Sequence, residues 1–151
     1  QASEPRLLIE SLPIIEWLDE TIPKPSFFTG DAFSRQHIRS LCEIVNAGIQ
    51  PLQNTTTAEE LPEDRRKDCM LFFNRRGLTA YTAMIKDTAG KFSVGDSVTA
   101  ADLFLIPQCY AANRFGIELE KEFPLLAKIY ANGRATEECK AAEPEKYEHL
   151  K

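Results

Sequence analysis

The sequence is poor in histidine and has no paired cysteine motif, and both shortages restrict its chemistry. Its two histidines are His37 and His149, so a metal site of several histidines is excluded and a Ser/His/Asp triad would depend on His37 alone. The four cysteines form no C-x-x-C pair, which excludes a zinc ribbon and a thioredoxin-type redox motif. We therefore expect no bound metal and four reduced thiols, mostly core residues, in a cytoplasmic protein.

Long apolar runs and an excess of basic residues are also missing. No run approaches the roughly 18 apolar residues that a membrane-spanning helix needs. The net charge of −5 and the isoelectric point near 5.1 disfavour nucleic acid as a partner, because binding phosphates requires a concentrated basic face. What is present, 43% hydrophobic residues in a chain of 151, is enough for one domain or slightly more.

The beginning of the chain differs in pattern from the rest. Residues Arg6–Ile9 predict a short strand, and no later segment offers it a partner. Because a lone strand cannot satisfy its backbone groups, we expect the chain to lack an upstream segment. A helix should follow, with Ser11 as its N-cap. We interpret residues 1–22 as the end of an incomplete N-terminal domain and 23–31 as a proline-rich linker.

Residues 32–151 predict an all-helical domain. The apolar repeat indicates one helix from about Ala32 to Thr55, loosened at Pro51, and another from about Leu61 to Thr88. The second helix should bury Cys69, Phe72, Phe73, Tyr81, Met84 and Ile85. A further helix is expected to begin at Phe123–Pro124, and the polar tail from Glu143 is expected to fray. The fold class is therefore mainly α, a helical bundle preceded by one strand and one helix.

The sharpest local signal is a capping box. Thr99 as N-cap and Asp102 three residues later predict the start of a helix that carries Leu103, Phe104, Ile106 and Tyr110.

The pair Glu10–Ser11 is a candidate binding site. A helix N-terminus offers free N–H groups and a positive dipole end to an anion, and an adjacent carboxylate can hold a cation. Together they suit the zwitterionic α-amino acid moiety of a ligand. The alternative is that Ser11 is only an N-cap after a strand.

Gln50 and Asn54 lie four residues apart, and Thr55 and Thr56 follow them. On one helical face this polar group could line a ligand cleft, or it could be a solvated helix end.

Arg114, late in the helix that carries the capping box, has two readings of equal weight. It could complement the helix dipole, or its guanidinium could bind a substrate carboxylate through two N–H groups.

Three stretches resemble the zeta class of glutathione transferases, the maleylacetoacetate isomerases. Residues 10–20, E-S-L-P-I-I-E-W-L-D-E, followed by the proline-rich linker, resemble the fourth strand and third helix of the thioredoxin-like domain. Residues 47–54, A-G-I-Q-P-L-Q-N, resemble the class signature I-Q-P-L-x-N, and T-A-A-D at 99–102 matches the capping box of the superfamily's helical domain. The class usually has glutamine where this chain has Glu10.

The resemblance implies a glutathione-dependent cis–trans isomerase of the maleylacetoacetate type in tyrosine and phenylalanine breakdown. It implies a homodimer, a small acidic substrate and glutathione as cofactor. Glu10 and Ser11 would hold the γ-glutamyl end, Gln50 and Asn54 to Thr56 would line the site, and Arg114 would orient a substrate carboxylate. The serine that activates the thiol would lie upstream, so this chain would contain no catalytic residue and would be inactive alone. Two alternatives stay open: a general transferase acting on haloacids or other electrophiles, and a non-catalytic interaction module.

Overall fold

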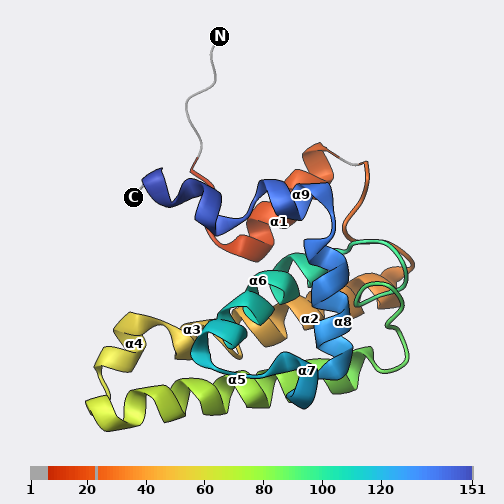
Figure 1. Ribbon diagram of the computed structural model, residues 1–151. Coiled ribbons are helices and arrows are strands. Elements are labelled where there is room, and N and C mark those ends of the chain that lie inside the picture. Colours follow the sequence, from red (N-terminus) through yellow and green to blue (C-terminus); the bar gives the residue numbers. More distant parts are fainter. Residues whose placement is uncertain (1–6, 23, 151) are drawn as a thin grey trace.

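The computed structural model describes residues 7–22 and 24–150 and shows a helical bundle (Figure 1). Its helices are α1 (Ser11–Thr21), α2 (Ala32–Asn46), α3 (Gln50–Gln53), α4 (Thr55–Glu59), α5 (Glu63–Ile85), α6 (Ala100–Phe115), α7 (Leu119–Glu122), α8 (Pro124–Arg134), α9 (Glu137–Ala141) and the 3₁₀ helix Pro144–Leu150. The predicted fold class, mainly α, is confirmed for these residues.

Helix α6 occupies the centre of the bundle, where it packs against α2, α5, α7 and α8. Its inward side chains, which include Leu105, Cys109 and Ala112, are completely buried. Helices α1 and α9 lie on one side of α6, and the long α5 lies on the other (Figure 1). This arrangement leaves the N-terminal helix beside the elements that carry the predicted site.

The strand predicted at Arg6–Ile9 is not formed in the described part of that segment. Leu7, Leu8 and Ile9 are exposed and belong to no strand, and Arg6 lies outside the described residues. No neighbouring strand is available to them among residues 7–22 and 24–150. A strand needs such a neighbour to accept and donate its backbone hydrogen bonds.

The continuous helix predicted from Ala32 to Thr55 was wrong. Helix α2 ends at Asn46, and α3 begins four residues later with Pro51 in its first turn. A helix through this region would require the Pro51 nitrogen to donate to the Ala47 carbonyl, and proline has no hydrogen there. The first turn of a helix needs no such bond, so proline is tolerated in α3.

Helix α5 covers most of the predicted range but buries fewer of its residues than expected. Tyr81 and Ile85 are completely buried, whereas Phe72 is 60% exposed, Met84 is exposed, and Cys69 and Phe73 are half-buried. Helix α5 lies at the edge of the bundle, so only one of its faces is covered (Figure 1). On that face Gly77 permits a close approach, because a Cβ there would lie 2.2 Å from Cγ1 of Ile49.

The capping box at the start of α6 is confirmed. The Asp102 carboxylate is completely buried and accepts hydrogen bonds from the Thr99 N–H at 2.9 Å, the Thr99 hydroxyl at 3.0 Å and the Ser93 N–H at 2.8 Å. Asp102 therefore fixes both the helix start and the loop that precedes it.

The tail does not fray over its described part. Residues Pro144–Leu150 form a 3₁₀ helix, and the Tyr147 hydroxyl donates to the Ala141 carbonyl at 2.9 Å. Two charged side chains of this segment bond to preceding helices: Glu145 accepts from the Tyr110 hydroxyl of α6, and Lys146 donates to the Lys140 carbonyl of α9.

No helix in the described part of the chain is long and apolar enough to cross a membrane. The same residues contain no group of three or more histidine, cysteine, aspartate and glutamate side chains that could hold a metal.

Candidate functional site

A cavity of about 630 Å³ lies between α1, α2, α3 and α6. Its wall contains three of the predicted site residues, Glu10, Ser11 and Gln50. The remaining lining residues are Ile14, Ile15, Val45, Asn46, Gln53, Leu103, Phe104, Pro107 and Gln108. The fold thus brings together groups that are 40 residues apart in sequence, and we take this cavity, called here the amide cleft, as the candidate site.

At one end of the amide cleft, the start of α1 has an unusual backbone. Glu10 precedes the helix with φ 66° and ψ 127°, a backbone conformation that residues other than glycine rarely adopt. Such strain costs on the order of 1–3 kcal/mol and is concentrated at functional sites. Ser11 is the first residue of α1, so its predicted role as N-cap was wrong: Glu10 occupies that position and makes no side-chain capping bond.

The beginning of α1 presents unpaired donors. The first bond of the helix runs from the Ile14 N–H to the Glu10 carbonyl at 3.0 Å. The N–H groups of Ser11 and Leu12 precede that bond and have no acceptor within the helix, and Pro13 has no N–H. An anion at this end of the cleft would meet two N–H groups, the Ser11 hydroxyl and the positive end of the helix dipole.

Gln50 and Asn54 do not share one helical face as predicted, because a helix boundary separates them. Gln50 begins α3 and lines the cleft, whereas Asn54 caps α4 by accepting a hydrogen bond from the Thr56 N–H at 3.0 Å. Neither Asn54 nor Thr56 is among the residues that line the cleft. The side chain of Thr55 lies outside the described part of the structure.

Sequence reasoning missed a cluster of three amides, of which Gln53 from α3 and Gln108 from α6 line the cleft and Asn74 from α5 lies behind it. Gln53 and Gln108 exchange two hydrogen bonds of 3.0 Å. Asn74 donates to Gln53 at 3.0 Å and accepts from Gln108 at 2.6 Å. One signal was present in the sequence: Asn74 is four residues before Leu78 and seven before Tyr81, on the buried face of α5.

Arg114 lies in the last turn of α6 and is exposed. Its guanidinium carbon is 5.8 Å from the centre of the Tyr110 ring, and it does not line the amide cleft. This placement is compatible with dipole complementation. Its predicted role toward a substrate carboxylate stays a prediction.

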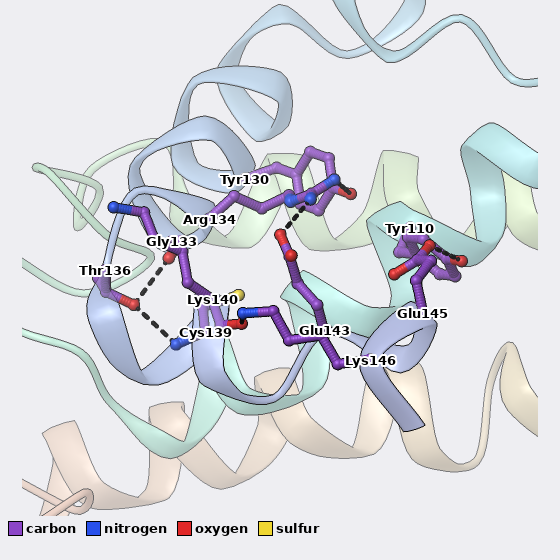
Figure 2. Close-up of polar contacts among 10 residues, drawn as sticks. All are labelled: Tyr110, Tyr130, Gly133, Arg134, Thr136, Cys139, Lys140, Glu143, Glu145 and Lys146. Carbon is purple, nitrogen blue, oxygen red and sulfur yellow. Dashed lines mark hydrogen bonds and ion pairs between the residues drawn. The ribbon is translucent and has the colours of Figure 1, made fainter. Parts of the chain in front are cut away.

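A larger cavity of about 790 Å³ lies between α6, α8 and the C-terminal segment, and its wall is mainly apolar. Three of its four charged residues are bonded to neighbours: Arg134 binds Glu143 at 2.5 Å, and the Tyr110 hydroxyl donates to Glu145 at 2.6 Å (Figure 2). The bond between Tyr110 and Glu145 raises the pKa of the phenol and lowers that of the carboxyl. Its polar groups hold the tail in place, so we assign ligand chemistry to the amide cleft.

The amide cleft is equipped to bind and orient rather than to activate a nucleophile. Among the described residues of its wall, Glu10 is the only charged one. The buried thiols of Cys42 and Cys109 do not line it, and burial raises the pKa of each to about 12, which keeps them protonated. An anionic ligand would therefore be recognised by neutral donors, and a cationic group by Glu10.

The chain is similar to known proteins over most of its length. The family model described as "Glutathione S-transferase, C-terminal domain" matches residues 49–142. A probable maleylacetoacetate isomerase 2 of Drosophila melanogaster is 34% identical over 137 residues, which is 91% of this chain and 60% of that protein. The chain spans about 55–63% of the length of the curated relatives it matches.

Two solved structures have the same fold over nearly the whole chain. A maleylacetoacetate isomerase from Anaeromyxobacter dehalogenans, with dicarboxyethyl glutathione and citrate in its active site, has a TM-score of 0.92 and 37% identity; the match covers 97% of this chain and 67% of that one. A holo maleyl pyruvate isomerase, a bacterial zeta-class enzyme, has a TM-score of 0.87 and 31% identity, covering 95% and 71% of the two chains.

Proposed function

Because the chain belongs to the glutathione S-transferase family, in its zeta class of maleylacetoacetate isomerases, we propose that it forms the helical part of a glutathione-dependent cis–trans isomerase. The observation that supports this most directly is the amide cleft, where Glu10, Ser11 and Gln50 meet. The proposed substrate is a small acid of the maleylacetoacetate type.

The cleft suits the γ-glutamyl end of glutathione, which carries an ammonium and a carboxylate on one carbon. The Glu10 carboxylate is the only charged group of the described wall and can pair with the ammonium. The Ser11 hydroxyl and the N–H groups at the start of α1 can bind the carboxylate. Gln50 offers both a donor and an acceptor on the opposite side.

When bound, glutathione supplies a thiol whose reversible addition to the cis double bond allows rotation and release of the trans form. The residues of this chain hold the γ-glutamyl end and keep the acidic substrate in reach through neutral donors. The Ser11 hydroxyl and the start of α1 are assigned to the glutathione carboxylate, so the thiol needs a different activating group. We propose that this group lies upstream of residue 1, and that residues 1–22 complete that upstream domain, 23–31 link it, and 32–151 form the helical domain.

Several finer assignments belong to the same proposal. We propose maleylacetoacetate rather than maleylpyruvate as substrate; relatives named for the former are up to 38% identical to this chain, and relatives named for the latter are up to 35% identical. The enzyme would then act in tyrosine and phenylalanine breakdown. A cytoplasmic location, inferred from four free cysteines, and a homodimer complete the proposal.

A glycine substitution tests the role of Glu10, because it separates binding from stability. In the full-length gene product, Glu10→Gly removes the carboxylate and also relieves the positive φ. Glutathione affinity measured by calorimetry should fall about tenfold or more, as expected for a lost charge-assisted bond, while the unfolding midpoint holds or rises. Glu20→Ala, which removes an exposed acid from the other end of α1, is the matched control and should bind glutathione normally. Unchanged affinity in Glu10→Gly would remove Glu10 from the binding site.

A further inference from the structure

For the amides of Gln53, Asn74 and Gln108, each N–H group can be matched to the acceptor it uses. Asn74 uses both N–H bonds, one to Gln53 Oε1 and one to the Met70 carbonyl at 2.9 Å. Gln108 also uses both, one to Gln53 Oε1 and one to Asn74 Oδ1. Gln53 uses one, to Gln108 Oε1, so the second N–H on its Nε2 is the donor of the cluster that no partner within the cluster accepts.

The orientation of the Gln53 amide is fixed by its neighbours. Its Oε1 accepts hydrogen bonds from both Asn74 and Gln108. A turn of the amide by 180° would place its NH₂ against those two donors, which would then lack an acceptor, and would turn its oxygen toward Gln108 Oε1, which would lose its donor. Asn74 is completely buried and Gln108 is 3% exposed, so water cannot replace the lost bonds easily. The cluster therefore holds the amide with Nε2, not Oε1, as the group that remains available.

We propose that Gln53 is a specificity-determining residue that donates this N–H to a carboxylate bound in the amide cleft, and that Asn74 and Gln108 are its positioning residues. Gln53 and Gln108 both belong to the cleft wall, whereas Asn74 lies behind it. Since the described wall contains no cationic side chain, an oriented amide is a means of selecting an anion there. The inference rests on the proposed function, because it assumes that glutathione and an acidic substrate are the occupants.

The carboxylate has two possible sources, glutathione and the substrate, and a pair of variants distinguishes them. In the full-length gene product, Gln53→Glu keeps an acceptor for Asn74 and Gln108 but places a negative charge where the donor was. Gln53→Met removes the donor without adding charge; because it also removes the acceptor for Asn74 and Gln108, its unfolding midpoint is measured alongside. Gln36→Glu adds the same charge on the exposed face of α2 and is the control.

We measure the dissociation constant of glutathione by calorimetry and the KM of maleylacetone at saturating glutathione. If Gln53 binds glutathione, its dissociation constant should rise about tenfold in Gln53→Met and further in Gln53→Glu. If Gln53 binds the substrate, KM should rise by the same factor while the dissociation constant is unchanged. Either result supports the proposal, provided that Gln36→Glu behaves as wild type.

The proposal would be overturned if the dissociation constant and the KM both stayed within twofold of wild type. Gln53→Met allows this comparison even if Gln53→Glu fails to fold. A wild-type protein that binds no glutathione would overturn the proposed function, and with it this inference. A wild-type protein that binds and turns over, with Gln53 variants equal to it, would overturn the inference alone. Asn74→Asp tests the positioning role: it removes a donor that fixes Gln53 Oε1, so KM or the dissociation constant should rise with kcat preserved.

Discussion

The carboxylate of Asp102 should be among the most costly side chains to remove from the fold. Asp102→Ala deletes the acceptor for three donors, two from Thr99 and one from the Ser93 N–H. Loss of a helix cap costs about 0.5–2 kcal/mol. The Ser93 N–H, in a residue that is completely buried, would also lose its partner, which adds about 1–3 kcal/mol. We therefore expect the free energy of unfolding to fall by roughly 2–4 kcal/mol.

Urea denaturation followed by circular dichroism measures this loss directly. Asp102→Asn should lose an intermediate amount of stability. Its amide keeps one acceptor oxygen, but its NH₂ group faces N–H and O–H groups that themselves donate. Asp87→Ala removes an exposed acid just beyond α5 and should change the stability by less than about 0.5 kcal/mol. The reasoning is refuted if Asp102→Ala loses no more stability than Asp87→Ala.

The other predictions concern binding and thiol chemistry. If Arg114 orients a substrate carboxylate, Arg114→Lys should raise KM several-fold although charge is kept; unchanged kinetics would leave only the dipole role. Ser11→Ala should weaken glutathione by about 1.5–3 kcal/mol but leave the unfolding midpoint unchanged, because Ser11 is not the N-cap; the opposite pattern would contradict its binding role. In the folded protein Cys42 and Cys109 should resist a thiol reagent at pH 8, while the two half-buried cysteines react. The raised thiol pKa values also predict that stability declines as the pH rises from about 9 toward about 12, where only the unfolded state ionises; a flat profile would contradict this.

Features that depend on neighbours in sequence were predictable. The capping box follows from Thr99 and Asp102 alone, because both partners lie within one helical turn. The apolar repeat likewise located most of the long helices. Pro51 was recognised as a disturbance, but the sequence did not show that the chain would end one helix and begin another rather than bend. Ile49, which lies between the two helices, packs closely against Gly77, and a contact between such distant segments is not readable from local sequence.

Features that depend on tertiary packing were not predictable. Gln53, Asn74 and Gln108 lie on three helices, and nothing in their spacing indicates that their amides meet. The one available signal, which the sequence analysis did not use, is that Asn74 is a polar residue on the buried face of α5. The backbone of Glu10 was missed for a related reason, since its positive φ is imposed by surroundings rather than by its own preference. The prediction that Glu10 and Ser11 lie at a helix start was correct, but it did not assign the cap.

The most direct test of the proposed function is a turnover assay that monitors substrate and glutathione together. The full-length gene product is mixed with maleylacetone, with and without glutathione, and the cis and trans forms are separated while total glutathione is measured. An isomerase requires glutathione, converts cis to trans over many turnovers and leaves the glutathione concentration unchanged. Consumption of one glutathione per substrate would identify a conjugating transferase, and a rate equal to that without the protein would contradict an enzymatic function.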